Sequence, residues 1–276
     1  MDDGTIVTLR SADGSEAAVS LHGGHLLSWR PAGEREQIYT SPTTQPTAGK
    51  ALRGGAPICF PQFAQRGPLA KHGFARTSRW ELVTGPSVGS VSEATFQLDS
   101  TMVASGWEHP FCLVLVVKLG PAWLELHLQA ANTGRQAFEF TGAIHTYFAV
   151  DDVRDANVRG LKGLRYEDSA GGGVVKEDAA SEVRFDGEVD RIYLGAPAEV
   201  DLVGGGMPRR RIVQEGFGDT VVWNPGPMKA TALGDMPAAD WTRMVCVEAG
   251  VVGSPVTLAP GKTWRGMQRV ELGPIS

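Results

Sequence analysis

Apolar and polar residues alternate with a period of two along most of this chain, and that periodicity is typical of half-buried β-strands. Leu124, Leu126 and Leu128, for example, share one face of a predicted strand, while the residues between them point the other way. Helical spacing is almost absent, apart from a turn or two of helix expected between Lys229 and Trp241. The chain is therefore predicted to be all-β.

Strands are expected throughout the sequence, and two large antiparallel sheets packed face to face accommodate them most simply. The predicted strands are residues 5–9, 17–21, 25–30, 80–84, 92–98, 111–119, 123–129, 138–148, 198–203, 211–214, 220–223, 243–249, 255–258 and 263–272. No domain boundary stands out, so residues 1–276 are predicted to form a single domain. The 35 glycines and 17 prolines suit many tight turns, and we expect Gly171–Gly173 and Gly204–Gly206 at hairpin or loop tips.

Charge and composition exclude several classes of partner. The net charge of -5 and the scarcity of basic runs argue against nucleic acid, which requires a dense Lys/Arg surface. The run Arg209 to Arg211 is interpreted as a solvated turn before a strand. No apolar run approaches the ~18 residues of a membrane span, and the acidic N-terminus lacks a signal core. The cysteines Cys59, Cys112 and Cys246 are expected to be buried free thiols. We therefore expect a cytoplasmic, monomeric protein with no nucleic-acid or membrane partner.

Two basic segments are candidates for binding an acidic ligand. Arg53 precedes paired glycines and two prolines, and such a stiff loop can present a side chain to a ligand. Lys71, His72 and Arg76 follow within one short segment. A guanidinium is the protein group that best matches a carboxylate or phosphate. A structural ion pair remains the alternative for each arginine taken alone.

A histidine and two acids are candidates for proton chemistry. Apolar residues share one face of the segment 138–148, so His145 must project from the other face, and its ordinary pKa of ~6.5 makes it a natural proton donor near neutrality. Glu248 ends an apolar run in which Cys246 shares its strand face, so desolvation should raise the pKa of that carboxyl. Asp190 stands at a probable strand entry. Hydrogen-bonded or ion-paired structural roles remain open for all three.

No metal site is predicted, because the six histidines form no close i, i+2 or i, i+4 pair and the cysteines form no pair. No cofactor-binding glycine loop is predicted either, since neither glycine run opens a helix.

Taken in order, these segments resemble the glucose-6-phosphate 1-epimerases, or hexose-6-phosphate mutarotases, of the aldose 1-epimerase superfamily. The resemblance rests on Leu52 to Phe63, Lys71 to Arg76, Ala143 to Phe148, Asp190 to Tyr193, Val222 to Pro225 and Met244 to Gly250. It implies a galactose-mutarotase-like super-sandwich with an open carbohydrate cleft on one sheet face. It also implies a general acid at His145, a general base at Glu248, and substrate contacts from Arg53, His72, Arg76 and Asp190. Lys71 stands where many relatives carry Gln, although an ammonium can bind a phosphate as a point charge.

The implied reaction interconverts the α and β anomers of glucose 6-phosphate by acid/base ring opening, without metal or cofactor. Two alternatives stay open: a non-catalytic module that binds or senses a sugar phosphate, and an epimerase acting on a neutral aldose. A glycosidase is a more distant alternative, in which Asp190 and Glu248 would form the required carboxylate pair.

Overall fold

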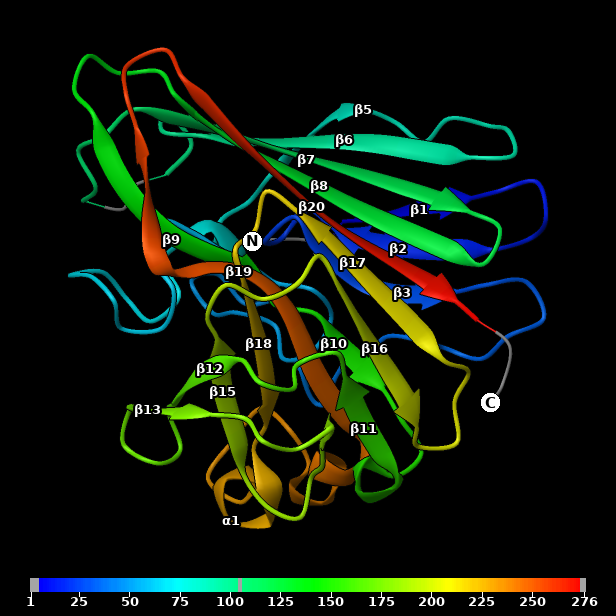
Figure 1. Ribbon diagram of the computed structural model, residues 1–276. Coiled ribbons are helices and arrows are strands. Elements are labelled where there is room, and N and C mark those ends of the chain that lie inside the picture. The colour runs from blue at the N-terminus through cyan, green and yellow to red at the C-terminus, as the bar shows by residue number, and fades with distance from the viewer. Residues whose placement is uncertain (1–4, 104–105, 274–276) are drawn as a thin grey trace.

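The computed structural model describes residues 5–103 and 106–273, which form two large antiparallel sheets with a smaller third sheet (Figure 1). The nine-stranded sheet has the spatial order β14 (Glu182–Val183), β11 (Ala156–Arg159), β16 (Glu199–Gly204), β17 (Arg210–Glu215), β20 (Thr263–Leu272), β8 (Trp123–Asn132), β7 (Phe111–Gly120), β6 (Ser92–Asp99) and β5 (Glu81–Thr84). The eight-stranded sheet has the order β13 (Val174–Glu177), β12 (Arg165–Asp168), β15 (Val189–Tyr193), β18 (Asp219–Asn224), β19 (Met244–Leu258), β9 (Phe138–Ile144) and β4 (Ile58–Cys59), and β10 (Tyr147–Ala149) also pairs with β19. The predicted all-β super-sandwich is confirmed.

The remaining elements are short. The third sheet, which was not predicted, consists of β1 (Ile6–Arg10), β2 (Glu16–Ser20) and β3 (His25–Arg30). One α-helix, α1 (Gly226–Ala230), and the 3-10 turns η1 (Ala75–Thr77), η2 (Val153–Asp155) and η3 (Ala238–Arg243) complete the described part of the chain. Among the described residues, no helix has the length and apolar character needed to cross a membrane.

The core lies between the sheets, and strand alternation builds it. In β7, Leu113, Leu115 and Val117 are fully buried, while the residues between them are half-exposed on the outer face. The main hydrophobic cluster extends from Val7 in the small sheet to Val270 in β20, so all three sheets contribute to it. Burial of each large aliphatic side chain stabilises the fold by roughly 1.5–3 kcal/mol, which explains why the alternating pattern dominates the sequence.

The sequence pattern missed the shortest strands and misjudged the ends of others. Strands β4 and β11 to β14 have only two to four residues each, and an alternation that short carries no usable signal. The segments 243–249 and 255–258, predicted as two strands, belong to β19 except for Arg243, which ends η3, and the register of β19 against β9 shifts between Val251 and Val256. The predicted strand 138–148 is divided into β9 and β10 at His145 and Thr146. Both glycine runs lie at hairpin tips, as predicted.

Two smaller predictions are wrong. Arg210 is fully buried rather than solvated, because β17 starts one residue early and turns its side chain inward. There Nη1 donates a hydrogen bond to the Ala149 carbonyl oxygen at 2.6 Å. Its neighbours Arg209 and Arg211 do face outward. Cys112 is half-buried, because it faces the outer side of β7, although all three cysteines are free as predicted.

The glycine pair after Arg53 is required by the backbone. Gly55 has a φ of 69°, and a Cβ at this position would lie 2.3 Å from the Leu26 carbonyl oxygen. Gly55 N donates to the Tyr39 carbonyl at 2.7 Å, and its own carbonyl accepts from Tyr147 N at 2.8 Å. These contacts hold the Arg53 loop against the segment around Tyr39 and against β10.

We expect Gly55→Ala to lower the free energy of unfolding by about 2–4 kcal/mol, because the substitution adds both backbone strain and a steric clash. Urea titration followed by tryptophan fluorescence measures the change. Gly187→Ala is the matched control, since Gly187 has no left-handed φ and no atom within 4 Å of the added Cβ. Equal stabilities of the two variants would contradict this account of the loop.

Candidate active site

A cavity of about 600 Å³ lies on the eight-stranded sheet and gathers every site residue predicted from the sequence. Strands β15 and β19 contribute Asp190 and Glu248, and His145 comes from the break between β9 and β10. The loops on either side of β4 supply the basic residues Arg53, Lys71, His72 and Arg76. Segments separated by almost two hundred residues therefore meet at one place.

His145 faces Glu248 because of the strand register. Ile144 is opposite Ala249 and Tyr147 is opposite Cys246, so the two residues between them are carried past Val247 and Glu248. His145 Nδ1 lies 3.3 Å from Glu248 Oε1. Both residues are buried, with 7% and 1% of their surfaces exposed. The pair is therefore a close, dry arrangement of an imidazole and a carboxyl group.

Burial changes the protonation of this pair. It raises the pKa of Glu248 well above its ordinary value, with the nearby Asp190 charge adding to the effect. It lowers the pKa of His145 well below its ordinary value, and the positive charges of Arg76 and Arg53 lower it further. The raised pKa of Glu248 was predicted. The expectation that His145 titrates near neutrality is wrong for the free protein, because sequence alone did not show its complete burial.

Aromatic rings hold the imidazole in place. The His145 ring stacks on the Tyr147 ring with centroids 4.9 Å apart. It packs against the Trp223 ring in a T-shaped arrangement with centroids 6.1 Å apart. His145 N donates to the Pro57 carbonyl at 2.9 Å. Tyr147 has the same parity as His145 in the segment 138–148, whereas Trp223 was quoted only as part of a motif. The rings exclude water and leave the imidazole little freedom to rotate.

His72 is a second buried imidazole beside the first, with ring centroids 5.4 Å apart. The amide of Ala64 donates to His72 Nδ1 at 3.2 Å, so Nδ1 is an acceptor and Nε2 carries the proton. Burial is the main reason why the pKa of His72 is far below its ordinary value. His72 also has a φ of 65°, an uncommon conformation for a residue other than glycine. A neutral N–H donor is thus held in the cavity.

The two arginines differ in their surroundings. Arg53 Nε donates to Asp235 at 3.1 Å, and Arg53 Nη1 donates to the Tyr147 hydroxyl at 2.9 Å. Arg76 donates only to the Lys71 carbonyl, at 3.0 Å, and its Nε is buried without a hydrogen-bond partner. Within residues 5–103 and 106–273, neither Arg76 nor Lys71 forms an ion pair. Arg53 is therefore a braced guanidinium, and Arg76 is a cation without a counter-charge.

Further charged residues line the cavity that sequence reasoning did not single out. Arg66, from the loop after β4, forms an ion pair of 2.6 Å with Glu167 of β12. Lys229 of α1 lies 3.9 Å from Asp190. Burial raises the pKa of Asp190, and the Lys229 ammonium counters part of that rise. These residues carried no motif, and only their position in the fold shows that they belong to the site.

Two residues of the cavity wall, His145 and Glu248, belong with Cys246 to the one group of possible metal ligands that the described residues form. Ligand atoms of His145, Cys246 and Glu248 all lie within 4.8 Å of one another. Sequence spacing missed this group, because its members come from two strands and include neither a histidine pair nor a cysteine pair. Residues of these types suit zinc.

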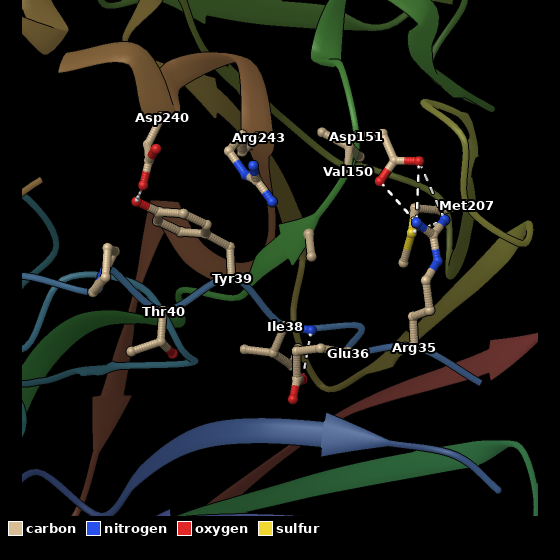
Figure 2. Close-up of a pocket in the computed structure, with 12 residues that line it drawn as sticks. Arg35, Glu36, Ile38, Tyr39, Thr40, Val150, Asp151, Met207, Asp240 and Arg243 are labelled. Carbon is tan, nitrogen blue, oxygen red and sulfur yellow. Dashed lines mark hydrogen bonds and ion pairs between the residues drawn. The ribbon is translucent and has the colours of Figure 1, made fainter. Parts of the chain in front are cut away.

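A second cavity, of about 460 Å³, contains none of the predicted site residues (Figure 2). Two interactions between its lining residues are an ion pair of Arg35 with Asp151 at 3.0 Å and a hydrogen bond that the Tyr39 hydroxyl donates to Asp240 at 2.7 Å. The sequence also contains a Gly-x-Ser-x-Gly pattern at residues 85–89. Ser87 lies in the exposed connection between β5 and β6 rather than on a strand-to-helix turn, so the pattern is not a nucleophile elbow.

Comparisons with known proteins show the family to which this chain belongs. The sequence model of the aldose 1-epimerase family matches residues 5–271. A protein of Cenchrus ciliaris named as a candidate glucose-6-phosphate 1-epimerase is 34% identical over 98% of this chain and 85% of its own length. A protein of the same name from Escherichia coli is 36% identical over 84% of this chain and 79% of its own.

Solved structures show the same fold. A candidate mutarotase from Salmonella typhimurium superposes with a TM-score of 0.90 at 31% identity, covering 99% of this chain and 92% of that one. A galactose mutarotase related enzyme from Lactobacillus acidophilus shares the fold at 15% identity, with a TM-score of 0.76 and 99% of both chains covered. With the family match extending over nearly the whole sequence, this chain belongs to the aldose 1-epimerase family.

Proposed function

We propose that this protein interconverts the α and β anomers of a hexose 6-phosphate, with glucose 6-phosphate as the first substrate to test. One observation carries the substrate class: Arg76 and Lys71, two cations without carboxylate partners among the residues that the structure describes, line the same cavity as the His145–Glu248 pair. A phosphate dianion would supply the missing counter-charge. The names of the relatives from Cenchrus ciliaris and Escherichia coli point to the same substrate.

The proposed reaction needs one proton donor and one proton acceptor on the sugar. The acceptor takes the proton of the C1 hydroxyl while the donor protonates the ring oxygen, and the bond between C1 and that oxygen breaks to give the aldehyde. Rotation about the C1–C2 bond followed by the reverse steps closes the other anomer. We propose Glu248 as the acceptor and His145 as the donor. Arg53, His72 and Asp190 are proposed to bind the sugar.

The assignment depends on which of the two side chains carries the proton in the free protein. In the free cavity burial favours the uncharged forms, which are neutral His145 and protonated Glu248. This neutral pair already contains the single proton that the reaction uses. Nδ1 and Oε1 lie 3.3 Å apart without hydrogen-bond alignment in the free protein, so the transfer of that proton to the imidazole requires the two groups to realign when the sugar binds. The pair then has an ionised carboxylate and a protonated imidazole without taking a proton from solvent.

Two other functions remain distinguishable by experiment. A non-catalytic sugar-phosphate module would bind the sugar without accelerating anomer exchange, and membership of an epimerase family favours the enzyme. An epimerase for neutral aldoses would have no use for the unpaired charge of Arg76 and Lys71. Anomer-exchange NMR on glucose 6-phosphate, glucose and galactose separates the three cases. A cytoplasmic location and a monomeric state remain predictions from the sequence.

We expect His145→Asn and Glu248→Gln each to reduce the rate of anomer exchange at least ~100-fold, because each variant removes one half of the proton relay. Exchange NMR on glucose 6-phosphate gives the rate, and thermal unfolding together with sugar binding checks that the cavity is intact. An exchange rate within tenfold of the wild-type rate in either variant would show that the residue is not part of the relay.

Substitutions of Arg76 and Arg53 should affect kcat/KM for glucose 6-phosphate and for glucose differently. Replacing Arg76 with Met should lower kcat/KM for glucose 6-phosphate roughly ten- to a hundredfold and leave glucose unchanged, because a charge-assisted bond to phosphate is lost. Arg53→Met should lower kcat/KM for both sugars, since Arg53 braces Tyr147. Equal losses for the two sugars in Arg76→Met would show that Arg76 holds the architecture and does not recognise the phosphate.

The lowered pKa of His145 predicts how its ring titrates. A histidine with a lowered pKa takes up a proton only at a pH below its ordinary value of 6.5, so the His145 ring signals should stay at their neutral positions as the pH falls through 6.5. Arg76→Met should move the titration to higher pH, because it removes a repelling charge. Arg35→Met is the control, since Arg35 pairs with Asp151 outside this cavity. A wild-type midpoint near 6.5, read by NMR, is the result that contradicts the burial argument.

A further inference from the structure

Cys246 is the one member of the buried group His145, Cys246 and Glu248 for which the proposed reaction has no use. Cys246 and Glu248 alternate on one face of β19, and the break between β9 and β10 sets His145 beside them. One potential ligand atom from each side chain lies within 4.8 Å of the other two. Cys246 is fully buried, and His145 and Glu248 line the cavity in front of it. A cation bound between His145 and Glu248 at the cavity wall would therefore lie within reach of the Cys246 sulfur behind them.

Two polar atoms of this group lack hydrogen bonds. His145 Nδ1 and Glu248 Oε2 are buried and have no hydrogen-bond partner. The 3.3 Å approach of Nδ1 to Glu248 Oε1 is close enough for an ion pair, but it is not aligned as a hydrogen bond. Buried polar atoms are almost always satisfied, and exceptions often mark a catalytic role or the place of an ion.

The donor set fits one class of metal. Zinc takes nitrogen, sulfur and oxygen ligands at about 2.0–2.3 Å in a tetrahedral arrangement, and three protein ligands leave the fourth position open. When the thiol and the carboxyl are both ionised, their two negative charges match the charge of Zn²⁺. Magnesium and calcium require oxygen ligands in larger numbers than this group offers. Arg76 and Lys71 line the same cavity and oppose the entry of a cation, which favours reversible binding over a permanent structural site.

We propose that His145, Cys246 and Glu248 form a binding site for Zn²⁺, and that zinc bound there inhibits anomer exchange. The inhibition rests on the proposed function, because zinc would occupy the imidazole and the carboxylate that transfer protons. The binding itself does not depend on that function. Sugar and metal would then compete for the same two side chains.

Metal binding is measured first, on protein freed of metal with a chelator. Zn²⁺ is titrated in competition with a chromophoric chelator into wild-type protein, Cys246→Ser and Cys112→Ser. We expect one zinc per chain in this site and at least a tenfold weaker affinity in Cys246→Ser. Cys112→Ser should match wild type, because Cys112 faces the outer side of β7. Mg²⁺ in excess should not displace the zinc. Equal zinc affinity in Cys246→Ser and wild type would overturn the proposed site.

Spectroscopy with cobalt tests the site without relying on a variant. Co²⁺ bound through Cys246 should produce a thiolate-to-cobalt charge-transfer band in the near ultraviolet, and glucose 6-phosphate should reduce the intensity of that band by competition. A cobalt spectrum without a thiolate band in the wild-type protein would also overturn the site.

Inhibition is then measured by exchange NMR, with each variant normalised to its own rate without zinc. Zinc should inhibit wild type and Cys112→Ser at concentrations at least tenfold lower than it inhibits Cys246→Ser. If zinc binds through Cys246 but exchange continues at full rate, the site stands, and both the inhibition and the proposed roles of His145 and Glu248 are overturned. If no exchange occurs in the absence of zinc, the proposed function fails while the binding result is unaffected.

Discussion

The structure of the site depends on the break between strands β9 and β10, both of which pair with β19. The pairing of β9 with β19 ends at Ile144 and the pairing of β10 with β19 begins at Tyr147, and His145 lies in the interval with its backbone amide bonded to Pro57 rather than to the sheet. This interruption turns the imidazole toward Glu248 without exposing either side chain to water.

Burial determines the protonation states of His145 and Glu248, and it makes their charged forms unfavourable. Removing a carboxyl and an imidazole from water favours their neutral forms, so the cavity holds a single shared proton instead of an ion pair. The surrounding cations are balanced unevenly. Arg53 and Arg66 are neutralised by Asp235 and Glu167, whereas the charges of Arg76 and Lys71 are not. In a protein with a net charge of -5, this local excess of positive charge is the feature that suits an anionic sugar.

Much of the fold followed from the sequence, because burial of one strand face produces a periodic pattern. The strands β6, β7 and β20 were predicted to within one residue, and β8 was predicted three residues too short at its end, since each has eight to ten residues and a buried face. The short strands β11 to β14 were not predicted. They form because they pair with neighbouring strands, and their own residue pattern is too short to indicate a strand. Arg210 shows the same limitation: whether an arginine at a strand end turns inward depends on where the ladder begins.

In the candidate site, the properties that depend on neighbouring residues differ clearly from the properties that depend on residues distant in the sequence. The sequence by itself determined which side of its segment His145 projects from, that the neighbours of Glu248 would desolvate it, and that Arg53 stands beside glycines and prolines in a stiff loop, because each depends on residues a few positions away. Only the tertiary structure decided that Arg53 is braced by Asp235 while Arg76 has no counter-charge, and that Cys246 stands behind the proton-transferring pair. Those properties depend on the register of strands distant in sequence and on the depth of the cavity, and a local pattern contains neither.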